Sequence, residues 1–125
     1  MTERPILQPG PAHPITIEPN HARVIVMIGG QTIADTRRAL RLTESTIPPV
    51  LYIPRADVDM AALERSATHT YCPYKGDASY FSIPAGGERS VDAIWTYETP
   101  FEAVAAIKDH LAFYPERVGA IEERR

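Results

Sequence analysis

Hydrophobic residues in this chain form short segments that are separated by turn-forming residues. Val24 to Ile28 is an apolar run rich in β-branched side chains, and the alternating segment 31–36 follows it after the pair Gly29-Gly30. Both glycines can adopt positive φ without steric cost, so the pattern predicts a β-hairpin. A phosphate-binding glycine loop would need a longer loop and a following helix.

The next segment, 38–44, alternates in a way that assigns side chains to faces. Leu40, Leu42 and Glu44 share one parity, and side chains of one parity lie on one face of a strand. If the two leucines face inward, Glu44 points the same way as they do. Its carboxylate then lies either at a solvent-exposed rim or inside a cavity, and the alternation leaves both alternatives open.

Prolines and alternation together favour further short strands over long helices. The chain has 12 prolines in 125 residues, about twice the average usage, and each one blocks a helix interior or a central strand. The segments expected as strands are 15–17, 50–53, 68–72, 78–83 and 91–97, with a turn at 73–76. In the last of these, Ala93, Trp95 and Tyr97 share a face.

Two helices are predicted from capping signals. Asp57 precedes a segment, 58–65, that has the composition of a two-turn helix. Thr99 and Glu102 form a capping box with Pro100 at the first helical position. The apolar stripe at helical spacing that follows consists of Phe101, Val104, Ile107 and Leu111.

Composition agrees with one mainly β domain that carries one or two short helices. Hydrophobic residues make up 44% and charged residues 23% of the chain, which is typical of a globular protein. We expect an extended N-terminal arm at 1–20, a single domain at 21–118 and a solvated C-terminal tail at 119–125.

Charge and hydropathy exclude several classes of partner. The net charge of −3 argues against a nucleic-acid partner, and the basic group Arg37, Arg38 and Arg41 is interpreted as a solvated strand face. No apolar run approaches the roughly 20 residues that span a bilayer, and no signal-peptide core follows the N-terminus. We therefore expect no membrane partner and a cytoplasmic location.

The turn Cys72-Pro73-Tyr74-Lys75-Gly76 carries the most suggestive chemistry. Lys75 lies three residues from the only cysteine, and a nearby ammonium stabilises a thiolate. Cys72 and Lys75 are therefore candidate catalytic residues. The alternative is that Cys72 is a small buried hydrophobic residue. A base for the thiol is missing, because the parity of His69 places it on the opposite face.

Aromatic residues with polar tips form a second candidate site. Trp95 and Tyr97 share a face, and Tyr52, Tyr74 and Tyr80 occupy neighbouring segments. Apolar walls with a few oriented donors are typical of a small-ligand pocket, although the same residues also suit an aromatic core. In the pocket hypothesis Trp95, Tyr97, Tyr52 and Tyr80 are walls, and Lys75 and Glu44 are polar anchors.

Several strings in the chain together resemble a known family. They are GGQTIADT at 29–36, PPVLYIP at 48–54, TYCPYKG at 70–76, AIWTYETP at 93–100 and AFY at 112–114. In this order they resemble the bacterial "domain of unknown function 427" family over residues 21–118. The resemblance implies a β-tent fold, in which two small antiparallel sheets lean together over a pocket. The thalidomide-binding domain of cereblon and methionine sulfoxide reductase B share this fold, and some relatives bind ligands between aromatic walls. It implies no activity, since a fold alone does not supply one.

Two properties associated with such relatives do not fit these residues. Structural zinc in β-tent relatives is held by two Cys-x-x-Cys pairs, whereas this chain has one cysteine and four scattered histidines. The family has also been labelled nucleotidyltransferase-like, but that chemistry needs a Gly-Ser pair ahead of the acidic pair, and none precedes Asp57-x-Asp59. We expect neither a metal nor a cofactor.

Three hypotheses of function follow. The first is a small-molecule-binding domain with a polar and aromatic pocket between two sheets. The second is an enzyme that uses Cys72 and Lys75 for thiol or acyl chemistry. The third is an interaction protein whose strand edges pair with a second copy or with another chain.

Overall fold

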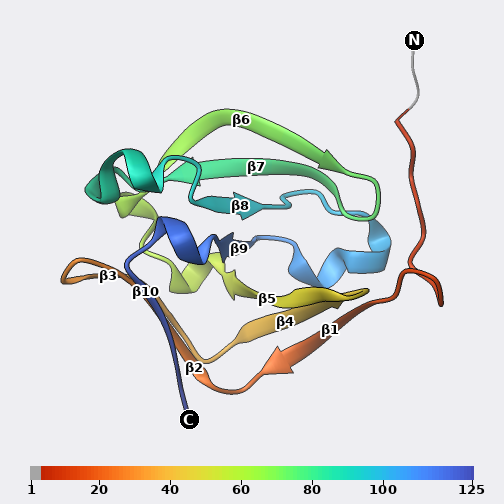
Figure 1. Cartoon of the computed structure of the whole chain (residues 1–125), viewed down its shortest axis with the longest axis horizontal. Helices are drawn as coiled ribbons and strands as arrows, with labels where there is room; N and C mark the ends of the chain where they lie inside the picture. The colour runs from red at the N-terminus through yellow and green to blue at the C-terminus, as the bar shows by residue number, and fades with distance from the viewer. Residues whose placement is uncertain (1–3) are drawn as a thin grey trace.

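The computed structural model describes residues 4–125 and is built from short strands joined by turns and 3-10 helices (Figure 1). The first three residues of the expected arm lie outside the described part. The strands are β1 Ile15–Asn20, β2 Arg23–Ile28, β3 Gln31–Thr36, β4 Ala39–Glu44, β5 Ile47–Pro54, β6 Glu64–Cys72, β7 Gly76–Ser82, β8 Ile94–Thr96, β9 His110–Phe113 and β10 Ala120–Arg124. The 3-10 helices are η1 Arg55–Asp57, η2 Met60–Ala62, η3 Pro84–Ser90, η4 Glu102–Ile107 and η5 Pro115–Arg117.

All strand pairs are antiparallel, and they form two sheets. The larger sheet has seven strands in the order β1-β4-β5-β9-β8-β7-β6, and the smaller has three in the order β10-β2-β3. Neither sheet closes into a barrel. The prediction of a mainly β fold made of two antiparallel sheets is therefore confirmed.

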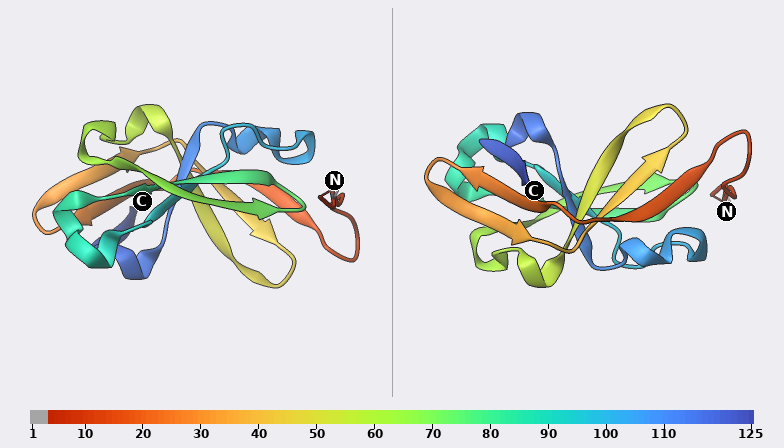
Figure 2. Two further views of the ribbon diagram at one scale, coloured as in Figure 1. Left: turned by 90° about the horizontal axis from the view of Figure 1, so that it is seen from above. Right: turned by 90° about the horizontal axis from the view of Figure 1, so that it is seen from below.

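The seven-stranded sheet is divided into two halves at the junction of β5 and β9. Only two residue pairs join these strands, Ile53 with Leu111 and Pro54 with His110. Pro54 has no N–H group, so it cannot extend the ladder of hydrogen bonds. Beyond the junction the β4–β5 hairpin and the β6–β7 hairpin diverge, as Figure 2 shows. The space between the diverging halves is where the candidate site lies.

The predicted hairpin is confirmed, and the predicted alternation on β4 holds in part. Gly29 adopts φ 59° in the turn between β2 and β3, and Ile28 pairs with Gln31 across it. On β4, Leu42 is buried and its neighbour Arg41 is exposed, as predicted, but Ala39 of the other parity is also buried and Leu40 is only half-buried.

Two apolar clusters hold the sheets in place. One lies where the three-stranded sheet meets the larger sheet and includes Val24, Val26 and Ile53. The other lies between the two halves of the larger sheet and includes Tyr52 and Tyr97. Tyrosines thus concentrate in the second cluster, next to the candidate site.

The predicted helix at 58–65 is wrong. Its residues form the short helix η2 and the start of β6, and Asp57 ends η1 rather than capping a helix. The Asp57 carboxylate instead accepts hydrogen bonds from Thr36 Oγ1 at 2.6 Å and Arg38 at 3.0 Å. The backbone N–H of Asp59 donates to Ile33 at 2.8 Å. These bonds tie the segment to β3 and prevent a continuous α-helix.

The helix predicted after Thr99 is also wrong in its type and length. Only the 3-10 helix Glu102–Ile107 forms, and Val104 interrupts it with non-helical φ and ψ. Its start is fixed from outside, because Phe101 N donates to the carbonyl oxygen of Lys75 at 3.0 Å. After a two-residue turn at Lys108-Asp109, the chain enters β9, which pairs with β5 and β8. Pairing in the sheet overrides the helical capping signal.

Both ends of the described chain make backbone contacts with the rest of the fold. The expected solvated tail contains β10, whose backbone pairs with β2 although Glu123 and Arg124 are exposed. In the arm, Leu7 N donates to the Pro73 carbonyl oxygen at 3.0 Å. Residues on both sides of the predicted range 21–118 therefore contribute to the fold.

The strand expected at 91–97 is shorter than predicted. Only Ile94–Thr96 is a strand, since the preceding residues follow η3 and Asp92 has a positive φ of 52°. Among residues 4–125, no helix has the length and apolar character needed to cross a bilayer.

Candidate functional site

A pocket of about 240 Å³ lies between the two halves of the seven-stranded sheet. Its lining residues are Leu42, Glu44, Val50, Tyr52, Lys75, Tyr80, Trp95, Tyr97 and Tyr114. All six residues predicted as ligand-binding are among them. The predicted position between two sheets is corrected, because both walls belong to one sheet that is split at the β5–β9 junction.

Strand parity explains how these side chains converge. Leu42 and Glu44 lie two residues apart on β4 and therefore share a face. On the opposite wall, Tyr80 of β7 pairs with Trp95 of β8, so their side chains lie next to each other. Each wall thus contributes alternate residues from two neighbouring strands.

Glu44 and Lys75 form a largely buried ion pair at the pocket wall. Lys75 Nζ donates to Glu44 Oε1, and the two side chains are only 9% and 13% exposed. The other carboxylate oxygen, Oε2, accepts a hydrogen bond from His13 Nε2 at 2.7 Å. The His13 ring in turn stacks on Tyr74, with ring centroids 4.1 Å apart. We call Glu44, Lys75 and His13 the ion-pair cluster.

The ion-pair cluster keeps Glu44 ionised. Burial alone would raise the pKa of this carboxyl group, but the hydrogen bonds from Lys75 and His13 outweigh that effect and lower the pKa. Of the two alternatives left open by the sequence, a rim or a cavity, the structure places Glu44 in the cavity wall.

The tyrosines of the pocket provide neutral hydroxyl groups. Burial raises the pKa of Tyr52 and of Tyr97 well above the ordinary value. Tyr52 OH accepts a hydrogen bond from Trp95 Nε1 at 3.2 Å, and Tyr80 OH shares one of 2.9 Å with Thr70 Oγ1. Both bonds fix the orientation of an aromatic wall.

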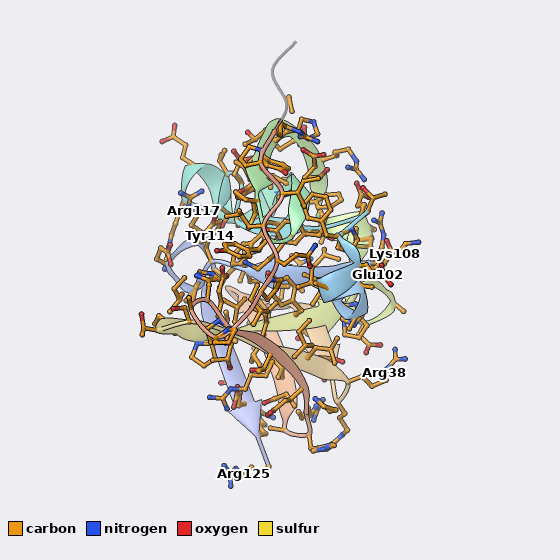
Figure 3. All side chains as sticks on the ribbon, turned by 90° about the vertical axis from the view of Figure 1, so that its right-hand side faces the viewer. Arg38, Glu102, Lys108, Tyr114, Arg117 and Arg125 are labelled. Atoms are coloured by element: carbon orange, nitrogen blue, oxygen red, sulfur yellow. The ribbon has the colours of Figure 1, made fainter. Side chains whose placement is uncertain are left out.

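Tyr114 completes the aromatic wall beside Trp95. The two ring centroids are 4.5 Å apart, and the Arg117 guanidinium lies 4.9 Å from the Tyr114 ring centroid (Figure 3). The two largest effects that raise the pKa of Tyr114, to about 12, are burial and, after it, a hydrogen-bond interaction with Tyr80.

Sequence reasoning missed two side chains of the site that carry polar groups, His13 and Tyr114. Tyr114 directly follows β9, and the aromatic pair that it forms with Phe113 was a usable signal. His13 lies in the arm, 31 residues before Glu44, and no local pattern indicates that contact.

The model of one protein family matches residues 16–124, and the family is described as a domain of unknown function (DUF427). The chain belongs to the DUF427 family. The family resemblance drawn from the sequence motifs is thus confirmed. No curated protein matches the chain.

Cys72 of this DUF427 domain lies beside the pocket and does not line it. Its Sγ is 3.8 Å from Lys75 Nζ, which is also the donor to Glu44. His69 is exposed on β6, in agreement with the parity argument that kept it away from the thiol. The catalytic role of Cys72 and Lys75 stays a prediction.

Other charged residues of the DUF427 domain lie outside the pocket. Arg38 pairs with Asp57 at 3.0 Å, and Arg41 projects from the face of β4 opposite Glu44. Within the part of the chain that the structure describes, no three His, Cys, Asp or Glu side chains gather as a metal site would require.

Proposed function

We propose that this DUF427 domain binds a small, polar or partly aromatic metabolite in the pocket between the two halves of the larger sheet. Trp95, Tyr97, Tyr52 and Tyr80 are its walls. Lys75 and Glu44 are its polar anchors. The observation that carries this proposal is the position of the ion pair, which is nearly buried and still lines the pocket.

The energetics of buried charge support a role for the ion pair beyond stability. Removing two charges from water costs several kcal/mol per ion, and an apolar pair of similar volume is often as stable. Lys75 and Glu44 face a hollow rather than packed core. This arrangement is explained if a ligand in the pocket forms hydrogen bonds with both side chains.

The size and chemistry of the pocket define the class of ligand. Its volume of about 240 Å³ is below the roughly 300–1,000 Å³ of drug-sized sites, so the ligand is small. The Lys75 ammonium donates to a carboxylate or carbonyl group, whereas Glu44 accepts from an amine, amide or hydroxyl group. The aromatic walls favour a planar ligand that stacks on them.

The test is native mass spectrometry of the purified domain after incubation with a metabolite extract. Wild type is expected to retain one small molecule, which Glu44→Gln and Trp95→Ala lose. The matched control is Asp35→Asn, which breaks an exposed ion pair with Arg23 on the smaller sheet and is expected to retain the same molecule. Retention by both pocket variants, or by none of the four proteins, would contradict the proposal.

One observation favours the thiol-enzyme alternative, namely the distance of 3.8 Å between Cys72 Sγ and Lys75 Nζ. A nearby ammonium favours the thiolate form of a cysteine. Replacement Cys72→Ser separates the two functions, since it leaves a binding domain able to retain its ligand but abolishes turnover by a thiol enzyme. Product formation from the retained molecule by wild type and not by Cys72→Ser would favour the enzyme.

The strand-edge alternative concerns a partner rather than a ligand. The sheet orders leave β1 and β6 at the edges of the larger sheet, and β3 and β10 at the edges of the smaller one. Edge strands carry unpaired backbone groups that can pair with a second copy. A homodimer would appear as a concentration-dependent mass in sedimentation without any ligand.

A further inference from the structure

A second and larger hollow lies between the smaller sheet and strand β5. Its volume is about 500 Å³, and we call it the apolar cleft. Its lining residues are Val24, Val26, Ile47, Pro48, Pro49, Val50, Leu51, Ile53, Trp95, Phe113, Pro115 and Ile121. The smaller sheet, β5 and the β8–β9–η5 segment each supply a wall.

Among residues 4–125, no charged side chain lines the apolar cleft, and its only polar side-chain group is the indole N–H of Trp95. That group already donates to Tyr52 OH at 3.2 Å. Three of the lining residues are prolines, which have no backbone N–H to offer a ligand. Water is poorly held in such a space, because it needs two to four polar partners. The chemistry of the cleft therefore suits a hydrocarbon group.

The apolar lining of the cleft follows β5 over most of the strand. Its β5 lining runs from Ile47 to Ile53, which is about 20 Å at the strand rise of about 3.3 Å per residue. A linear hydrocarbon chain that lies along β5 therefore contacts apolar side chains over its whole length.

We propose that the apolar cleft binds the linear hydrocarbon chain of a free small molecule. This goes beyond the proposed function, since the cleft is a separate hollow with its own walls. Trp95 and Val50 line both hollows, so a ligand in the cleft lies against the back of the aromatic wall. Trp95 is the only tryptophan of the chain, so its fluorescence responds to a ligand in either hollow, and variants of the cleft are needed to assign the signal.

The flank of the cleft disfavours a peptide or a second copy as its occupant. An incoming strand would have to pair with β10, the neighbouring edge of the smaller sheet, or with the part of β5 that β9 does not cover. β10 carries Glu122, Glu123 and Arg124, and charged side chains on an edge strand oppose pairing with another chain. The uncovered part of β5 begins with Ile47, Pro48 and Pro49, and the two prolines have no N–H to donate to an added strand. A ligand without a backbone avoids this obstacle.

The experiment is a titration of the domain with hexanol, octanol and decanol, followed by Trp95 fluorescence. These probes have one polar group and differ only in chain length. Each added methylene that enters the cleft is expected to tighten binding about fourfold, and decanol is expected to bind roughly fifteenfold tighter than octanol. Saturation at one molecule per chain is expected.

Two variants locate the probe. Ile47→Asp places a charge in the cleft at a position that is 51% exposed, so the fold tolerates it. Ile121→Asp does the same from the edge strand β10. Both are expected to weaken decanol binding at least tenfold. The matched control is Ile6→Asp, which changes an apolar residue that is 61% exposed and lies outside the cleft; decanol affinity is expected to be unchanged.

Several outcomes would overturn the proposal. They are no saturable binding of decanol, affinity that does not increase with chain length, and equal affinity in the two cleft variants and wild type. Binding to phosphatidylcholine vesicles without saturable alkanol binding would replace the free ligand with a membrane surface. Ligand retention in the aromatic pocket is a separate result. Glu44→Gln is expected to abolish that retention and leave decanol binding intact, so either claim can fail without the other.

Discussion

Replacement of Lys75 by methionine tests the energetics of the ion-pair cluster. Methionine keeps most of the volume of the side chain and removes its charge. Glu44 then keeps only the 2.7 Å hydrogen bond with His13 Nε2. Breaking a buried ion pair by removal of one member costs about 3–5 kcal/mol. Because the two side chains remain 9% and 13% exposed, we expect a loss of about 3 kcal/mol, the lower end of that range.

A double-mutant cycle separates the interaction energy of the ion pair from the cost of leaving one buried charge without a partner. Glu44→Gln combined with Lys75→Met leaves no charge unpaired, so the double variant is expected to recover about 2 kcal/mol of the loss. The control is Arg23→Met, which breaks an ion pair with Asp35 whose side chains are 36% and 41% exposed. It is expected to cost less than about 1 kcal/mol.

Urea unfolding followed by Trp95 fluorescence measures these differences, because the chain has a single tryptophan. With an m-value of about 1.5 kcal/mol/M, a loss of 3 kcal/mol lowers the urea midpoint by about 2 M. Equal midpoints for Lys75→Met and Arg23→Met would refute the reasoning, and so would a double variant that is no more stable than Lys75→Met.

Three further predictions concern pH, a turn and a strand. The lowered pKa of the Glu44 carboxyl group stabilises the fold at pH values above 4.5, the ordinary pKa of this group, and the stabilisation is lost as pH falls through the lowered pKa. Urea midpoints are therefore expected to fall more steeply between pH 7 and pH 3 in wild type than in Glu44→Gln. Parallel curves for the two proteins would contradict this. Gly76 has φ +110°, and a Cβ added there would lie 3.5 Å from Thr99 O. Gly76→Ala is therefore expected to lower the free energy of unfolding by about 2 kcal/mol. Gly30→Ala, whose added Cβ has no atom within 4 Å, is the near-neutral control in the same urea assay. Deletion of residues 120–125 removes β10 from β2 and is expected to cost about 2 kcal/mol, a fall of about 8 °C in Tm; an unchanged Tm in thermal scans would mean that the segment is a dispensable tail.

The strands were predictable where a local pattern determines them. Gly29-Gly30 marks the turn between β2 and β3, and the alternation on β4 places Leu42 and Glu44 on one inward face. Parity predicted the faces of Glu44, Trp95 and Tyr97, whereas Lys75 was predicted from the turn after Cys72. All three faces and the lysine meet at one pocket. Local parity suffices here because each pocket residue lies in or directly next to a short strand.

The helices were not predictable from the sequence, because contacts distant in the chain decide those segments. The stripe after Thr99 is buried as expected at Val104, Ile107 and Leu111. However, Leu111 reaches the core from β9, not from a helix. A capping box contributes about 1 kcal/mol, which the pairing of β9 on both sides outweighs. The helical periodicity identified the buried residues of this segment correctly, but it predicted an α-helix where the backbone forms a 3-10 helix and strand β9.

The contact of His13 with Glu44 shows the second limit. It joins the arm to the pocket through a loop in which Gly10 and His13 exchange backbone hydrogen bonds at 3.2 and 2.9 Å. Nothing in the pattern near His13 indicates a partner 31 residues away. Contacts of this kind depend on how the arm packs against the strands, which the sequence pattern around His13 does not encode.

The most direct test of the central claim uses the indole N–H resonance of Trp95, the only such signal that the chain can give in a ¹⁵N–¹H spectrum. The molecule retained from the metabolite extract is titrated into wild type, Glu44→Gln and Asp35→Asn. We expect the signal to move on titration in wild type and in Asp35→Asn, with no change in Glu44→Gln. A ligand that binds wild type and leaves the indole signal in place, or one that shifts it equally in Glu44→Gln, would place the binding site outside the pocket.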